Sequence, residues 1–257
     1  MSKEKRDFMA VPIPSRLNLT DNFAFSCHSD LACFNKCCRN KHLPLTPYDI
    51  LRLKTALNIH SDEFLSHYTL YRLDPDSGFP IISLKMADDS RKVCPFVCQD
   101  GCRLYKDRPT ACRLYPLGRA SRIIQDGTAR EEFFFLLDTP DCLGINEKRI
   151  RSVETWLYDQ GINPYIEMNN KMLGILFHPN RVRTTPLNEG QLQQVMVACY
   201  NLDLFREFIF KTRFLESFEI GEDIHLKIEG DDTALLDLAF DYLDLALFPD
   251  PHEDSVS

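Results

Sequence analysis

The cysteines are the residues of this chain whose type and spacing most clearly indicate chemistry. Nine of the ten lie in the first 142 residues, and the tenth is Cys199. Those nine form two groups and one trailing residue: Cys27, Cys33, Cys37 and Cys38; Cys94, Cys98, Cys102 and Cys112; and Cys142. A thiolate is a soft ligand, and groups of four thiolates on short loops suit tetrahedral zinc or an iron–sulfur cluster. The sequence therefore predicts a metal-binding protein that uses these nine cysteines as ligands, with an iron–sulfur cluster or zinc as cofactor.

Spacing limits how the ligands can be shared. Cys94, Cys98 and Cys102 are four residues apart, which would align them on one helix face, although Pro95 and Gly101 make a loop an equal alternative. Cys37 and Cys38 are adjacent, and neighbouring side chains of an extended chain point in opposite directions. This pair is therefore expected to bridge two metals or to supply separate sites. Two four-cysteine sites and one multinuclear cluster both remain open, and in either case we expect ligands from both groups to meet.

The remaining candidates are assigned from their surroundings. Cys199 lies at a helical apolar position and is interpreted as a core thiol. Cys142 follows Pro140 and Asp141 in a predicted loop, which favours a ligand. His28 is next to Cys27 but is interpreted as incidental, and the other six histidines have no ligand spacing.

Length and composition indicate an ordinary globular chain of one or two domains. The chain has 257 residues, of which 44% are hydrophobic and 26% charged, so it can bury a core without needing disulfides as staples. We expect no secretion signal, because two prolines precede any apolar run of the required length. No run approaches the roughly 18 to 20 apolar residues of a membrane span. A cytoplasmic, reducing location is therefore expected, where clustered cysteines are more often ligands than disulfides.

Charge is distributed unevenly along the chain. Residues 216–257 hold 13 acidic residues and one lysine, a net charge of −12; since the whole chain carries −8, residues 1–215 carry +4. Arginines and lysines crowd the second cysteine group, and we interpret them as offsetting an anionic thiolate site. Nucleic-acid binding is disfavoured because no long basic run is present. The acidic end is interpreted as a solubilising face or as a docking surface for a protein partner.

Three regions are expected along the chain. Residues 1–22 form an N-terminal arm, residues 23–145 the cysteine-cluster metal-binding domain, and residues 146–257 a helical C-terminal subdomain with the acidic end. The predicted fold class is α+β, with a small irregular cysteine-rich core and short hairpins followed by helices.

Local signals predict the elements that must position the cysteines. Thr46, Pro47 and Asp49 are typical of a helix start, so residues 45–59 are predicted to be helical, and a second helix is predicted from Ser61. Two strands are predicted within residues 71–86, around a Pro-Asp-Ser-Gly turn, and two more, 122–125 and 130–137, around Asp-Gly. Apolar residues at helical spacing follow from about residue 147: Ile150, Val153, Trp156 and Leu157; Leu192, Val195, Met196, Cys199 and Leu202; Leu235, Leu238, Tyr242 and Leu245.

Several enzyme motifs are missing. The ten glycines are never closer than nine residues apart, which rules out both G-x-G-x-x-G and a Walker A loop. Neither the C-x3-C-x2-C spacing of radical S-adenosylmethionine enzymes nor a G-x-S-x-G nucleophile elbow is found.

Two segments resemble the YkgJ family of cysteine-cluster proteins, described as zinc- or iron-chelating. One is Cys27-x5-Cys33-x3-Cys37-Cys38 followed by Leu45-Thr-Pro-Tyr-Asp-Ile, although the family's first cysteines are written CxxCxxCC. The other is residues 102–116, which match C-x-x-Y-x-x-R-P-x-x-C-R-x-x-P. The resemblance covers roughly residues 23–145 and implies metal chelation. Because the family includes flagellin lysine N-methylase, it also implies an alternative: a cluster-dependent enzyme, methyltransferase-like or redox, with a basic pocket that contains Arg108 and Arg113.

Overall fold

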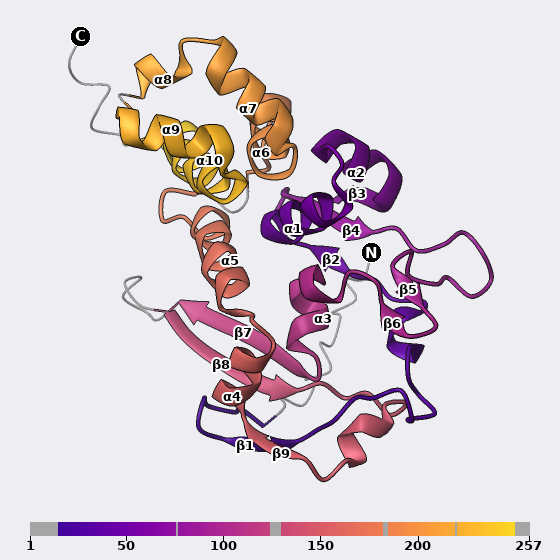
Figure 1. Cartoon of the computed structure of the whole chain (residues 1–257). Coiled ribbons are helices and arrows are strands. Elements are labelled where there is room, and N and C mark those ends of the chain that lie inside the picture. The colour runs from indigo at the N-terminus through magenta and orange to yellow at the C-terminus, as the bar shows by residue number, and fades with distance from the viewer. Residues whose placement is uncertain (1–14, 76, 124–129, 182–184, 219, 250–257) are drawn as a thin grey trace, which may run out of the picture.

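The computed structural model describes residues 15–75, 77–123, 130–181, 185–218 and 220–249. Within these residues helices and short antiparallel strands are mixed, and the C-terminal part is helical, which confirms the predicted α+β class. Figure 1 shows the C-terminal helices at one end of the molecule, with α5 leading from them toward the hairpin β7–β8.

The strands form four small antiparallel sheets in the described residues. The pairs are β1 (Asn22–Ala24) with β9 (Ile150–Ser152), β5 (Val97–Cys98) with β6 (Gly101–Cys102), and β7 (Leu117–Ile123) with β8 (Arg130–Leu136). The three-stranded sheet has the order β2 (Pro44–Leu45), β4 (Pro80–Leu84) and β3 (Thr69–Leu73). Both predicted hairpins are confirmed as β3–β4 and β7–β8. Asp76 of the first predicted turn and residues 124–129, which include the Asp126-Gly127 turn and the end of the predicted strand 122–125, lie outside the described residues.

The helices fall into an N-terminal and a C-terminal set. The N-terminal set is η1 (Lys36–Cys38), α1 (Pro47–Leu57), α2 (Ser61–Tyr68), η2 (Tyr105–Asp107), α3 (Thr110–Leu114) and η3 (Leu143–Asn146). The C-terminal set is α4 (Val153–Asp159), α5 (Asn163–Leu176), α6 (Glu189–Val195), η4 (Met196–Tyr200), α7 (Leu202–Lys211), α8 (Phe214–Ser217), α9 (Glu222–Gly230) and α10 (Asp232–Leu247). The turn η4 is a π-helix. None of the described helices is long and apolar enough to cross a bilayer.

Helix α1 begins as its sequence predicts. The Thr46 side chain accepts a hydrogen bond from the Asp49 N–H, and the Asp49 carboxylate accepts one from the Thr46 N–H at 2.9 Å. This reciprocal pair satisfies backbone donors that a helix N-terminus leaves free, and Pro47 at the first position needs no donor. The helix buries Ile50, Leu51 and Leu53, which fixes its face against the core.

One hydrophobic core extends from β1 to α10. Helix α1 packs against α5 and α10, and α2 packs against α7, so the N-terminal helices lie on the C-terminal ones (Figure 1). An ion-pair network around the buried Lys54 reinforces this contact. Lys54 of α1 binds Asp203 of α7 at 3.1 Å and Asp232 of α10 at 2.8 Å, while Asp203 also accepts hydrogen bonds from the Ser61 N–H and hydroxyl.

Segments near the two ends of the cysteine region pair with each other. Leu17 pairs with Phe134 of β8, and β1 pairs with β9 in the register Phe23 to Arg151. Residues 1–14 of the expected N-terminal arm lie outside the described residues. The prediction that Ile150 belongs to a helix is wrong, because Ile150 forms β9 with Ala24 and the helix begins only at Val153.

Candidate metal centre

The backbone brings the two cysteine groups side by side. The Cys94 N–H donates to the Cys38 carbonyl at 2.8 Å, and a β-bridge joins the next pair, Arg39 and Val93. The Asn35 side-chain amide donates to the Cys98 carbonyl at 3.0 Å, which ties the first cysteine loop to the hairpin β5–β6. Segments about sixty residues apart in the sequence therefore meet at their cysteines.

The second cysteine group lies on a hairpin rather than on a helix. Cys94 precedes β5, Cys98 ends β5 and Cys102 ends β6, so the looped alternative is the one that the chain adopts. Gly101 has a φ of 118°, a conformation that side chains rarely tolerate, which explains the glycine at this tight turn. Burial raises the pKa of the Cys94 thiol, and hydrogen bonds from the Phe96 and Val97 N–H groups oppose that rise. Backbone N–H groups directed at sulfur are donors that favour a thiolate.

Cys112 is positioned by a buried carboxylate that sequence reasoning treated only as a helix-start residue. Cys112 lies on α3, whose first residue is Thr110. The Asp49 carboxylate, which is fully buried, accepts hydrogen bonds from the Thr110 N–H and hydroxyl, both at 2.7 Å. Asp49 thus joins the N-terminus of α1 to that of α3, two residues before Cys112. Burial raises the pKa of this carboxyl, and the hydrogen bonds from Thr46 and Thr110 oppose the rise.

Cys142 meets the first cysteine group. The Leu143 N–H points at the Cys33 sulfur at 3.3 Å, and the Ser26 N–H donates to the Gly144 carbonyl at 3.1 Å. A Cβ on Gly144 would lie 2.6 Å from the Ser26 carbonyl oxygen, so only glycine allows this close approach. The segments that carry Cys27, Cys33 and Cys142 therefore pack together.

The thiols influence one another electrostatically in two overlapping sets. Partial burial raises the pKa of Cys27 to about 11, and the charges of Cys37, Cys142 and Cys33 add to that rise. The sulfur atoms of Cys37 and Cys38 lie 3.9 Å apart, and their hydrogen bond raises the pKa of Cys38. Burial and the charges of Cys37, Cys94 and Cys112 act in the same direction on Cys38. Such mutual destabilisation of thiolates is what a bound cation relieves.

The donor set suits a soft metal, and its geometry is open. All ten cysteines are free thiols, and nine of them lie on the loops and short elements just described. Within the described residues, no three cysteine, histidine, aspartate or glutamate side chains already converge at metal–ligand spacing. Thiol side chains on loops can turn toward an ion as it binds, and metal binding is commonly coupled to such ordering. The residues therefore fit zinc or an iron–sulfur centre by their chemistry and neighbourhood.

Arg108 and Arg113 support the cysteine loops. Both are buried, at 7% and 6% exposure. The Arg113 guanidinium donates to the carbonyls of Arg108 and Lys106 and to that of Gln160 at 2.6 Å, and it lies over the Tyr165 ring. Arg108 donates to the Tyr105 carbonyl and the Gln160 side chain. Five donors in a rigid fork suit an arginine that fastens one loop to several carbonyls. The contacts to Gln160 and Tyr165 come from distant sequence, so spacing could not have revealed this role.

A cleft opens beside the second cysteine group. It has a volume of about 670 Å³ and is bordered by Phe34, Arg39, Arg91, Cys94 and Cys98, among others. Arg91 is held by Asp89 through an ion pair of 3.1 Å. The exposed Cys98 thiol donates to the Gly101 carbonyl at 3.2 Å. The cleft gives solvent a direct approach to the cysteine loops.

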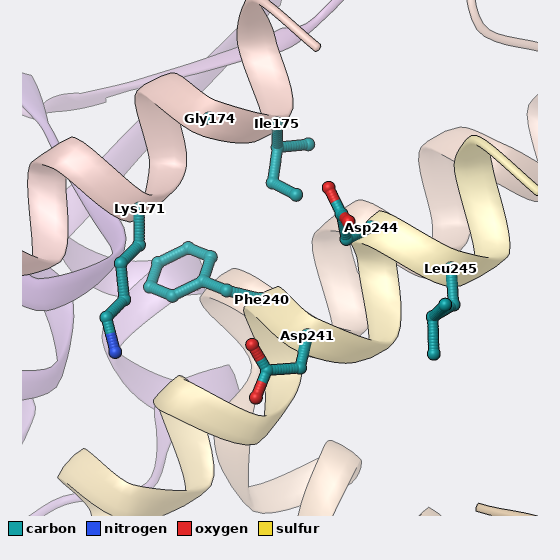
Figure 2. Close-up of a pocket in the computed structure, with 7 residues that line it drawn as sticks. All are labelled: Lys171, Gly174, Ile175, Phe240, Asp241, Asp244 and Leu245. Atoms are coloured by element: carbon teal, nitrogen blue, oxygen red, sulfur yellow. The ribbon is translucent and has the colours of Figure 1, made fainter. Parts of the chain in front are cut away.

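A second pocket, of about 390 Å³, lies between α5 and α10 and contains no cysteine. Figure 2 shows Lys171 on α5 and Asp241 on α10 among its lining side chains. Burial raises the pKa of the Asp241 carboxyl, and the neighbouring Asp237 adds to this effect, while Lys171 opposes it. Lys171 forms an ion pair with Asp237.

Cys199 is a core residue, as its position in the sequence predicts. Cys199 is 1% exposed within η4, and burial raises the pKa of its thiol, as suits a core residue. His28 lies 3.7 Å from carboxylate oxygens of both Asp30 and Glu147.

Comparison with known proteins finds a family match for the cysteine segment. Residues 26–142 match the model of one protein family. That family is CxxCxxCC, described as a "putative zinc- or iron-chelating domain", and the matched segment carries nine of the ten cysteines. No match was found among curated proteins or among solved structures. The match supports metal binding by the cysteine segment.

Proposed function

We propose that this protein binds metal through its clustered cysteines, as zinc thiolate or iron–sulfur centres held by residues 26–142. The candidate ligands are Cys27, Cys33, Cys37, Cys38, Cys94, Cys98, Cys102, Cys112 and Cys142. The observation that carries the proposal is the direct backbone contact between Cys38 and Cys94, which draws ligands from both groups into one neighbourhood. The family match to a chelating domain supports it.

The surrounding charges support thiolate ligation. The pKa of Cys37 is lowered mainly by its hydrogen bond with Cys38, and the positive charge of Lys41 lowers it further. Arg103 acts in the same direction on Cys94 and Cys102, whose pKa values are raised first by burial. A four-thiolate site is anionic, and cations at this range offset its charge. Zinc would fasten the loops together, whereas an iron–sulfur cluster would add one-electron redox capacity.

The wider organisation follows from this role. Residues 23–145 act as the metal-binding domain, and residues 146–257 support it through α5, α7 and α10, with the acidic end as a surface for a protein partner. A reducing compartment such as the cytoplasm would keep the thiols available.

The decisive experiment is metal and acid-labile sulfide analysis of the full chain purified without oxygen, together with its visible spectrum. Iron with labile sulfide and a visible thiolate band would identify an iron–sulfur protein, and zinc in a colourless sample would identify a zinc protein. A folded preparation that contains neither metal and takes up neither one would refute the proposal. A variant with Cys199→Ser serves as the matched control, because this buried thiol lies outside the cysteine loops.

A further inference from the structure

We propose that this chain forms a symmetric dimer in which strand β3 of one copy pairs antiparallel with strand β3 of a second copy. The pairing would join two three-stranded sheets into one sheet with the strand order β2-β4-β3-β3-β4-β2. None of the cysteines takes part, so this inference is independent of metal binding.

The outer edge of β3 carries backbone groups that have no partner among the described residues. Just beyond the two ends of the strand, the Lys85 N–H donates to the Tyr68 carbonyl at 2.8 Å, and the Asp74 N–H donates to the Phe79 carbonyl at 2.9 Å. Bonded and non-bonded positions alternate along an antiparallel ladder, so the even-numbered residues of β3 bond to β4. The odd-numbered residues direct their N–H and C=O groups to the open edge: Thr69, Tyr71 and Leu73.

The side chains of β3 continue the core face of the sheet beyond the part that the core covers. Ile82 of β4 is buried, and its partner on the same face, Tyr71, is 52% exposed. Leu73 shares this face and is 45% exposed, while Leu70 on the opposite face is 56% exposed. Large apolar side chains exposed on both faces of an edge strand are typical of a strand that pairs with another chain.

Strand β3 also lacks the features by which proteins commonly protect an edge strand. It contains no proline and no lysine, and its pairing with β4 runs through five residues without a bulge. The other edge of the same sheet is β2, which is two residues long and begins with Pro44. One edge of this sheet is therefore protected in the usual way, and the other is open.

The open edge is complementary to a second copy of itself. A twofold axis at Tyr71 places Tyr71 opposite the same residue of the second copy, and Thr69 opposite Leu73. Each of these pairs joins two residues that direct their backbone groups outward, so all the outward groups of both strands find partners. An axis at Arg72 would instead place two like charges directly opposite each other, which is destabilising.

Charge favours a second copy in this register. Leu70 of one copy lies opposite Arg72 of the other, and the apolar stem of an arginine can cover a leucine. Strand β3 has no acidic residue, although the chain carries a net charge of −8, so two copies can meet here without repulsion between carboxylates. Five residues per chain bury less than the roughly 800 Å² per partner of a standard interface. We therefore expect a reversible dimer that forms at high protein concentration.

The first test is sedimentation equilibrium of the full chain over a range of concentrations, with a reducing agent present to prevent disulfides between chains. We expect a monomer–dimer equilibrium that Tyr71→Lys weakens by about tenfold or more, because two lysines would then lie opposite each other. Leu226→Lys is the matched control, since Leu226 on α9 is 68% exposed and lies outside β3. A dimer that Tyr71→Lys leaves unchanged would overturn the proposal. A chain that is monomeric at every concentration would also overturn it and would leave the edge to an extended segment of another protein.

The second test examines the register by exchanging the charge at position 70. Leu70→Glu places a carboxylate opposite Arg72 of the second copy, whereas Leu70→Lys places a like charge there. We expect the Glu variant to dimerise about tenfold more tightly than the Lys variant. General repulsion between chains of net charge −8 predicts the opposite order. Equal affinities, or tighter association of the Lys variant, would overturn the twofold register at Tyr71.

The third test uses amide hydrogen exchange of the wild-type chain, resolved by residue, at low and high protein concentration. The N–H groups of Leu70 and Arg72 face β4 and should be protected at both concentrations. Those of the odd-numbered residues of β3 should become protected only at high concentration. Exchange of these outward amides that does not change with concentration would overturn the pairing. Because this measurement needs no variant, it decides the question even if a substituted chain fails to fold.

Discussion

Replacing Asp49 by alanine tests whether one buried carboxylate couples the helical core to the proposed metal ligands. The carboxylate accepts hydrogen bonds from the Thr46 N–H, the Thr110 N–H and the Thr110 hydroxyl, at 2.9, 2.7 and 2.7 Å. The hydroxyl can turn toward Asn169, whose buried Oδ1 has no partner among the described residues. The two backbone N–H groups cannot turn. Each buried donor left unpaired costs about 1 to 3 kcal/mol, so we expect Asp49→Ala to lower the free energy of unfolding by about 3 kcal/mol.

The assay is urea unfolding followed by tryptophan fluorescence. The only tryptophan, Trp156, is buried and donates its ring N–H to the Leu114 carbonyl at the end of α3. It therefore reports on the helix that carries Cys112. Asp49→Asn keeps one acceptor oxygen and should lose less, about 1 to 2 kcal/mol.

Metal content separates a general loss of stability from a local one. At low urea, where Asp49→Ala is still folded, its metal content should fall because the start of α3 is released. Thr46→Ala is the matched control, since it weakens α1 by about 1 kcal/mol and leaves the Thr110 contacts intact. If Asp49→Ala unfolds within about 0.5 kcal/mol of wild type, its donors find other partners and the reasoning is wrong.

Three further predictions concern contacts around the core and the cysteine loops. Burial alone would raise the pKa of Asp203, but hydrogen bonds from Ser61 and Lys54 lower that pKa below the ordinary carboxyl value of about 4. The ionised Asp203 therefore stabilises the folded chain fully above the ordinary carboxyl pKa, and this stabilisation is lost as the pH falls through the lowered pKa of Asp203. Asp203→Asn should therefore flatten the acid side of a stability-against-pH curve, and an unchanged curve would contradict the assignment. Arg113→Lys keeps the charge but loses the guanidinium hydrogen bonds to several carbonyls, so we expect the free energy of unfolding in urea to fall by about 2 kcal/mol. A loss below about 0.5 kcal/mol would show that the charge alone is sufficient. Gly144→Ala forces a Cβ to 2.6 Å from the Ser26 carbonyl oxygen and should lower the metal content per folded chain; an unchanged metal content would contradict this.

The sequence correctly predicts the helices and hairpins that are determined by residues close together in the chain. The capping residues Thr46, Pro47 and Asp49 lie within four positions of one another, and the helix they predict is α1. The hairpin β3–β4 likewise follows from its turn residues and apolar strands. In contrast, β1 and β9 are three residues each and pair Phe23 with Arg151, far along the chain, so neither carries a local signature. Ile150 was assigned to a helix because three apolar residues after it keep helical spacing, and pairing with Ala24 overrides that pattern.

The candidate site was predictable in its chemistry and less so in its supports. We expect ligands from both cysteine groups to meet because a site built from distant segments ties those segments into one fold, and the backbones of the two groups do meet at Cys38 and Cys94. The arrangement of residues 94–102 could not be predicted, because the four-residue spacing of the cysteines suits a helix whereas Pro95 and Gly101 suit a loop. The dual role of Asp49 was hidden, because its second partner, Thr110, lies sixty-one residues away. The positive charge of Arg113 near the second cysteine group is also compatible with a substrate pocket. Only its contacts with the distant residues Gln160 and Tyr165 identify Arg113 as a support for the cysteine loop.

Helix α1 links the proposed metal ligand Cys112 to the rest of the molecule. At its start, Asp49 holds the helix that carries Cys112, and one turn later Lys54 binds Asp203 and Asp232 on the C-terminal helices. Both contacts come from one rigid element, so displacement of α1 disturbs the ligands and the helical region together. Anything that binds the folded state and not the unfolded one stabilises it, and thiolate-bound metal does so strongly. Because Lys54 and Asp49 share α1, loss of metal should weaken the packing of α1 against α5 and α10, and loosening those helices should in turn lower metal affinity.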